Sequence, residues 1–204
     1  GETGSTNAIA TTGSHQSSFG GGDYDAFLVK FNSSGVRQWG TYYGGSNWDL
    51  GRSVAVDGSW NVYLGGETGS TNAIATTGSH QSSFGGGDLD AFLVKFNSSG
   101  VRQWGTYYGG SNWDLGMSVA VDGSGNVYLG GWTYSTNAIA TTGSHQSSFG
   151  GGDLDAFLVK FNSSGVRQWG TYYGGSNWDL GMSVAVDGSG NVYLGGWTYS
   201  TNAI

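Results

Sequence analysis

The sequence contains no cysteine and no proline, and only 10% of its 204 residues are charged. Without cysteine, the chain can form no disulfide and offers no thiolate ligand to a metal ion. Seven basic residues stand against 14 acidic ones, which gives a net charge of −7. This balance argues against nucleic acid and anionic lipid as partners, because both require clustered positive charge. No apolar run reaches the roughly 18 residues of a membrane span, so we expect no membrane partner.

Glycine and aromatic residues are abundant instead, with 41 glycines and 15% aromatic residues. Disordered chains are poor in aromatic residues and rich in charge, so this composition favours a folded protein. The glycines lie between short apolar runs, as turn residues do. The sequence therefore predicts an all-β protein whose short strands are joined by tight turns.

The sequence repeats itself with a period of 65 residues. Residues 1–65, 66–130 and 131–195 are near-identical copies, and residues 196–204 begin a fourth. A unit repeated this regularly buries its apolar surface against a neighbour like itself, which predicts a single repeat array over residues 1–204. The few positions at which copies differ are Tyr24/Leu89, Arg52/Met117, Trp60/Gly125, Glu67/Trp132 and Gly69/Tyr134.

Each copy predicts four strands. Residues 53–57 and 61–65 are β-prone runs on either side of a turn, which is the pattern of a hairpin. A long polar loop follows, and residues 91–96 and 101–108 form the third and fourth runs. The third run is apolar on both faces, as in a sheet that is covered on both sides. These features predict four-stranded antiparallel sheets stacked on one another, which are the blades of a β-propeller.

The stretch that starts at Asp90, DAFLVKFNSSGVRQWGTYYGGSNWDLGMSVAVDGSGNVYLGG, resembles the bacterial SBBP β-propeller repeat. That family typically shows Asp-Ala-Phe-x-x-Lys, then Tyr-x-Gly-Gly, then Ala-Val-Asp-x-x-Gly-Asn-Val-Tyr. The resemblance covers all three copies, and it implies a propeller fold and often an extracellular or cell-surface location. It implies no single activity. The alternative architecture is a β-trefoil, which also has three four-stranded repeats but usually shorter units.

The chain is out of phase with its blades. If the hairpin begins a blade, complete blades cover approximately 50–110 and 115–175, while 1–45 and 180–204 supply complementary halves of another. A closed propeller needs about four to eight blades, and one chain supplies only two complete blades and two halves. We therefore expect a single chain to form an incomplete ring. We therefore expect the chain to join itself head to tail, as a dimer or trimer, or to pair with further repeats of a longer chain. The overlap of residues 1–9 with 196–204 requires one copy to be displaced at each junction.

Two substitutions form a pair. Arg52 and Glu67 are predicted neighbours across the hairpin, and Met117 and Trp132 replace both together one repeat later. Tyr134 follows two residues along the same strand face, so the later hairpins carry an apolar patch. One interpretation is packing between blades or chains, and the other is an aromatic platform for sugar rings. The candidate ligand or interface residues are Met117, Trp132, Tyr134, Met182, Trp197 and Tyr199.

Chemistry-bearing clusters are sparse. Each copy has one histidine and no second histidine or cysteine to complete a catalytic or metal centre, so we expect no enzyme activity. Paired aspartates after a glycine triplet are compatible with calcium, although capping of the loop is the simpler interpretation. They are Asp23, Asp25, Asp88, Asp90, Asp153 and Asp155. We expect a structural or interaction module without a required cofactor, and the alternative is a multivalent carbohydrate-binding propeller that takes glycans as partners.

Overall fold

A computed structural model describes residues 1–202 of the chain, and every regular element in this range is a β-strand. The all-β class predicted from the sequence is confirmed. Ala203 and Ile204, the last residues of the predicted half-blade 180–204 and of the partial repeat 196–204, lie outside the described range.

The strands form four antiparallel sheets, of which the second and third have four strands each. Both run in chain order, β4-β5-β6-β7 and β8-β9-β10-β11, as the meandering blades of a propeller do. The first sheet has three strands and the last sheet has two. The strands are β1 (Glu2–Thr3), β2 (Asp25–Phe31), β3 (Arg37–Tyr43), β4 (Asp49–Val56), β5 (Val62–Thr68), β6 (Asp90–Phe96), β7 (Arg102–Tyr108), β8 (Asp114–Val121), β9 (Val127–Thr133), β10 (Asp155–Phe161), β11 (Arg167–Tyr173), β12 (Asp179–Val186) and β13 (Val192–Thr198).

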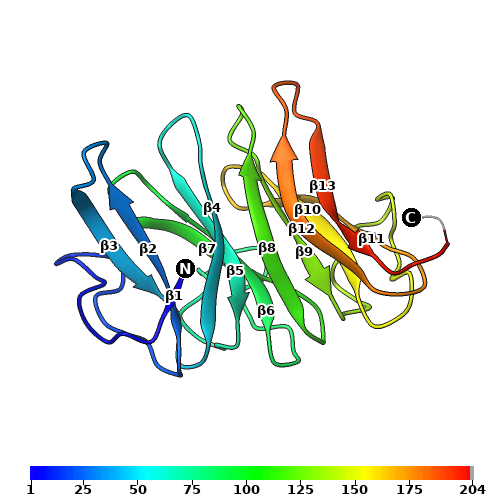
Figure 1. Cartoon of the computed structure of the whole chain (residues 1–204), viewed down its shortest axis with the longest axis horizontal. Coiled ribbons are helices and arrows are strands. Elements are labelled where there is room, and N and C mark those ends of the chain that lie inside the picture. The colour runs from blue at the N-terminus through cyan, green and yellow to red at the C-terminus, as the bar shows by residue number, and fades with distance from the viewer. Residues whose placement is uncertain (203–204) are drawn as a thin grey trace.

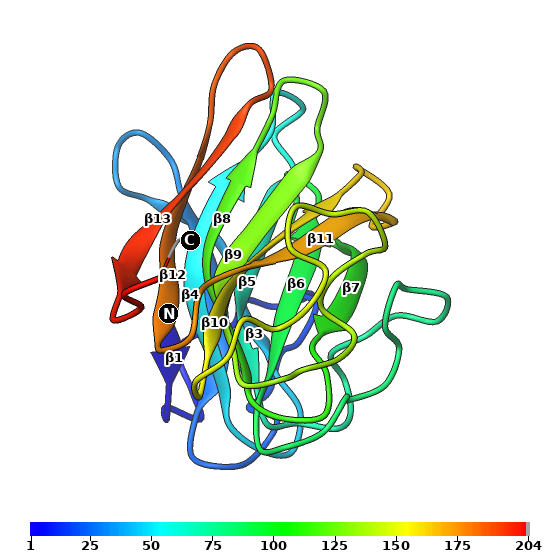
Figure 2. The ribbon, with the colours of Figure 1, turned by 90° about the vertical axis from the view of Figure 1, so that its right-hand side faces the viewer.

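The four sheets stand in a row. Figure 1 shows the N-terminal sheet at one end and the hairpin β12–β13 at the other, with the two complete sheets between them. Figure 2, which looks along the row, shows the sheets one behind another. The sheets therefore form an incomplete series of propeller blades, and the two ends of the series do not meet within the chain.

The core lies between consecutive sheets. The ring of Tyr43, at the end of β3, lies 5.3 Å from Phe92 and 5.9 Å from Phe96 of the next sheet. The contact recurs one repeat later, where Tyr108 lies 5.3 Å from Phe157. All these rings are fully buried. This packing explains why the third strand of a blade is apolar on both faces: each face is covered by a different neighbour.

A β-bulge interrupts the hairpin of each blade. In the first complete sheet, Leu50 lies opposite Glu67, and the register shifts between Gly51 and Ser53. Arg52 is the extra residue of the bulge and has no direct opposite. This register differs from the direct pairing of Arg52 with Glu67 that the substitutions suggested, because a bulge places two residues of one strand against one of the other.

Candidate functional site

The first sheet leaves most of one strand edge open. β1 pairs with β2 only through Asp25 and Ala26, and the amide of Phe27 donates to the Gly1 carbonyl at 2.9 Å. In the complete blade, the matching strand β6 pairs with β5 along its whole length. Residues 28–31 of β2 therefore present backbone groups on a side that is paired in complete blades.

The last sheet leaves the complementary edge open. β13 pairs with β12, whereas the equivalent strand β9 pairs with both β8 and β10. By the repeat, β12 and β13 correspond to the first two strands of a complete blade, and β2 and β3 correspond to the last two. They lie at opposite ends of the row (Figure 1).

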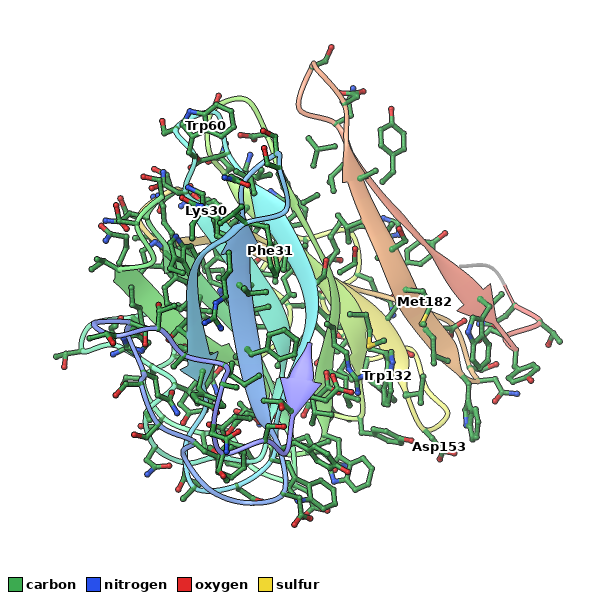
Figure 3. All side chains as sticks on the ribbon, turned by 60° about the vertical axis from the view of Figure 1, so that its left-hand side comes forward. Lys30, Phe31, Trp60, Trp132, Asp153 and Met182 are labelled. Atoms are coloured by element: carbon green, nitrogen blue, oxygen red, sulfur yellow. The ribbon has the colours of Figure 1, made fainter. Side chains whose placement is uncertain are left out.

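Apolar residues beside these edges are exposed, although their counterparts in complete blades are buried. Phe31 is 55% exposed, whereas Phe96 and Phe161 are 0% exposed. Tyr173, on the last strand of the second complete blade, is 37% exposed, whereas Tyr108 is 0% exposed. Figure 3 shows Phe31 on the outer face of the first sheet. The ends of the row thus present the rings that consecutive blades elsewhere bury against each other.

The histidines take part in the packing between blades. His15 lies 5.7 Å from Phe96, and His80 lies 5.7 Å from Phe161, each ring on the sheet that follows. Burial lowers the pKa of both imidazoles to about 4, and a neighbouring arginine contributes to the shift. His145 lies 5.9 Å from Tyr173. The polar-loop histidines are therefore ring-packing residues at the surfaces where blades meet.

The residues predicted to form a patch come together in part. Arg52 donates from Nε to Oε1 of Glu67 at 2.8 Å and from Nη2 at 2.5 Å. Glu67 is buried, which raises its pKa, while the guanidinium opposes this shift. In the next copy the ring of Trp132 lies 5.8 Å from Tyr134, edge to face.

The hairpin β12–β13 repeats this aromatic cluster on the outer face of the row. The rings of Trp197 and Tyr199 lie 5.2 Å apart. Met182, Trp197 and Tyr199 are 41%, 45% and 61% exposed. Figure 3 shows Met182 on this terminal hairpin.

A tryptophan precedes the first strand of each later blade, and we call Trp48, Trp113 and Trp178 the tryptophan rim. All three side chains are between 39% and 47% exposed. Trp48 donates from Nε1 to Asp23 at 3.0 Å, and Trp178 donates to Asp153 at 2.8 Å. The sequence reasoning missed the rim because it followed the positions that change. The available signal was a tryptophan repeated within the polar segment SNWD.

A cavity of about 550 Å³ lies between two members of the rim. We call it the Trp48–Trp113 pocket. It is lined by Asn47, Trp48, Gly69, Thr71, Phe84, Gly87, Asp88, Leu89 and Trp113. Its walls come from the turn before β4, the long loop after β5 and the turn before β8.

The predicted calcium aspartates separate into two groups. Asp23, Asp88 and Asp153 are exposed at the rim, whereas Asp25, Asp90 and Asp155 are buried. Each buried member faces a second buried aspartate at the start of the next sheet, which the sequence analysis did not single out. These partners are Asp49, Asp114 and Asp179. Within residues 1–202, no group of three or more His, Asp or Glu side chains is placed to hold a metal ion.

The middle pair, Asp90 and Asp114, shows the arrangement most fully. Asp114 accepts bonds from the hydroxyl of Thr133, the amide of Gly110 at 2.8 Å and the hydroxyl of Ser135 at 2.9 Å. Asp90 accepts at Oδ2 from the Gly85 amide at 2.6 Å, but among the described residues its buried Oδ1 has no donor. Burial raises the pKa of Asp90 to about 7, and Asp114 adds to the shift. Burial likewise raises the pKa of Asp114 to about 6.

In residues 1–202 there is no helix long and apolar enough to cross a membrane. A family model described as a β-propeller repeat, SBBP, matches residues 103–137 and 168–202. Each match begins in the last strand of a complete sheet and ends just after the hairpin of the following sheet. A regulatory protein, FlaEY of Caulobacter vibrioides, is 26% identical over 110 residues, which are 54% of this chain. The matched segment spans 12% of that relative's length.

Proposed function

We propose that this chain, two segments of which match the SBBP β-propeller repeat, is a non-enzymatic interaction module that assembles with itself through shared blades. The observation that carries the proposal is the complementarity of the open edges. The hairpin β12–β13 has the residues of the first two strands of a blade, and β2–β3 has those of the last two. A second copy therefore supplies what each end lacks.

The register of the shared blade follows from the complete ones. In the first complete blade Leu64 pairs with Val94, so Leu194 of one copy pairs with Val29 of the next. The four residues 192–195 then occupy an edge that is open. The next three residues, 196–198, compete with 1–3 of the receiving copy for the same positions.

The junction also covers the exposed rings. Within the chain, Phe161 packs against Tyr108 and His80 of the preceding sheet. By the repeat, Phe31 of one copy packs in the same way against Tyr173 and His145 of the other copy. Each such edge-to-face contact contributes about 0.5–1.5 kcal/mol beyond the burial of area. With two complete blades and one shared blade per copy, a dimer has six blades and a trimer nine, and about four to eight is usual. We favour a closed ring over an open filament because a ring leaves neither β2 nor β13 of any copy with an open edge.

Absolute mass in solution tests the proposal, measured by light scattering and by native mass spectrometry over a concentration series. We expect a single species at two or three times 21.2 kDa. A monomer at every concentration contradicts self-assembly, and would leave further repeats of a longer chain as the partner of the open edges.

A matched pair of variants locates the contact. Phe31→Ala removes a ring that is 55% exposed in the single chain, so we expect a shift toward monomer without loss of the fold. Val101→Ala alters a residue that is 56% exposed in the turn between β6 and β7 of the first complete blade, and it is expected to leave the mass unchanged. Equal effects of the two variants would contradict the proposed junction.

A further inference from the structure

The Trp48–Trp113 pocket is lined by a glycine at a position where the next repeat has a tyrosine. Gly69 lines the pocket, and the same position one repeat later is Tyr134. The ring of Tyr134 lies 5.9 Å from Trp113 and 5.8 Å from Trp132, so it occupies space beside the rim in the second complete blade. The two blades thus differ in whether an aromatic ring of the protein fills the space next to the tryptophan.

A second difference concerns the polar groups at the pocket. Trp48 and Trp178 donate their indole N–H groups to Asp23 and Asp153. Among residues 1–202, the equivalent pair in the middle copy, Trp113 and Asp88, makes no such bond. The indole N–H of Trp113 and the carboxylate of Asp88 therefore both remain available at the pocket wall.

The remaining polar group of the lining is the hydroxyl of Thr71, which makes no hydrogen bond among the described residues. Asn47 is already engaged, because its Nδ2 donates to the Gly69 carbonyl at 3.2 Å and its Oδ1 accepts from the amide of Trp48 at 2.9 Å. The pocket thus offers one donor, one charged acceptor and one hydroxyl between two indole side chains.

We propose that the Trp48–Trp113 pocket binds a neutral saccharide. Aromatic side chains provide apolar area for the C–H faces of a pyranose ring, while its hydroxyl groups pair with fixed polar groups around them. No lysine, arginine or histidine lines the pocket, and the chain carries a net charge of −7, so an acidic sugar is disfavoured.

The donor at Trp113 and the hydroxyl of Thr71 distinguish a sugar from an organic cation. A quaternary ammonium ion is attracted by indoles and a carboxylate, but it has no group that accepts a hydrogen bond. A sugar hydroxyl both accepts from the Trp113 N–H and donates to Asp88. This site goes beyond assembly through shared blades, because all of its lining residues come from one chain and none of them lies on β2 or β13.

Saturation-transfer difference NMR tests the inference, with the methyl pyranosides of glucose, galactose, mannose and N-acetylglucosamine as probes and tetramethylammonium chloride as the competing cation. We expect saturation of ring protons for at least one pyranoside, with an affinity that titration can measure. Binding of tetramethylammonium in place of all four sugars, or binding of no probe at millimolar concentration, overturns the proposal.

Gly69→Tyr is the decisive variant, because it copies the residue that already occupies this position in the next blade. We expect it to abolish sugar binding while the mass in solution and the thermal unfolding stay as in the parent chain. Trp113→Phe, which removes the indole donor, is expected to weaken binding by about tenfold. Trp178→Phe is the matched control for Trp113→Phe at the next rim position. Unchanged sugar binding in Gly69→Tyr would overturn the proposal.

The experiments distinguish failure of the assembly proposal from failure of the saccharide proposal. A monomer that binds sugar in a Gly69-dependent manner contradicts assembly alone. A ring of six or nine blades that binds no pyranoside contradicts the saccharide site alone.

Discussion

Asp90 and Asp114 come from consecutive sheets, and their carboxyl groups converge on one point beside the α-carbon of Gly109. A Cβ atom built on Gly109 would lie 2.5 Å from Oδ2 of Asp114 and 2.9 Å from Oδ1 of Asp90. Both side chains are fully buried. Since Asp114 already accepts several bonds and Oδ1 of Asp90 has no donor, a proton on Asp90 is the group that satisfies the pair.

The first prediction concerns this proton. The folded-state pKa of Asp90, about 7, lies above its unfolded value, so the folded chain binds more protons and this group's contribution to stability is lost as pH rises through 7. Asp90→Asn supplies an amide N–H in place of the proton. We expect the variant to be more stable than the parent at pH 8 by roughly 2 kcal/mol. Its free energy of unfolding should also change less with pH between pH 6.5 and 8.

Urea unfolding at several pH values measures the effect. Asp88→Asn, the same substitution at an exposed aspartate two residues earlier, is the matched control for the loss of one carboxylate. A parent chain whose stability is constant from pH 6.5 to 8 would count against a shared proton.

The second prediction concerns His80, whose contribution to stability changes with pH in the opposite direction to that of Asp90. Burial between rings lowers the pKa of His80 to about 4, so its contribution to stability is present above pH 6.5 and is lost as pH falls toward 4. His80→Phe keeps a ring next to Phe161 without a titrating group. Relative to the parent, its free energy of unfolding should increase by about 1 kcal/mol as pH falls from 6.5 to 5, in chemical denaturation curves. An identical acid dependence in parent and variant would refute this role.

The third prediction concerns a turn residue. Trp60 has φ 64° and is 72% exposed, and the same turn position is Gly125 in the next copy, with φ 78°. A side chain in the left-handed region costs about 1 kcal/mol relative to glycine. Trp60→Gly should raise the free energy of unfolding by about that amount, and Gly125→Trp should lower it. Thermal unfolding of both variants measures this, and shifts of the same sign would contradict the explanation.

The fourth prediction concerns Arg52 and Glu67. Arg52→Met alone leaves a buried carboxylate without its partner, which we expect to cost about 2 kcal/mol. Adding Glu67→Trp reproduces the pair found in the later copies, Met117 and Trp132. The double variant should therefore be more stable than Arg52→Met. A double-mutant cycle in urea gives the coupling energy, and simple additivity would mean that the two substitutions are independent.

Much of the fold could be predicted from the sequence, because periodicity and turn residues act locally. The third strand was expected at 91–96 and begins at Asp90. The first strand was placed at 53–57 but begins at Asp49, since a glycine and a bulge residue interrupt the β-prone pattern there. A bulge is a property of two paired strands, and the sequence of one strand does not reveal it.

The candidate sites were less predictable for a related reason. Asp90 was noticed beside its sequence neighbour Asp88, yet its partner in space is Asp114, brought close by the stacking of sheets. The importance of Gly69 also depends on what surrounds it. Its change to Tyr134 was visible in the sequence, but the cavity that the glycine lines exists only between two rim tryptophans from successive blades.

The partial cover of β2 gives the proposed junction the character of a strand exchange. Residues 28–31 are a toehold on which an arriving β13 can pair first, while Gly1–Thr3 still hold their place on Asp25, Ala26 and Phe27. Pairing then advances as each arriving residue replaces an identical or equivalent one. The exchange therefore gains new backbone hydrogen bonds only along the toehold, and the rest of the affinity of the ring comes from side-chain packing between the sheets that the junction brings together.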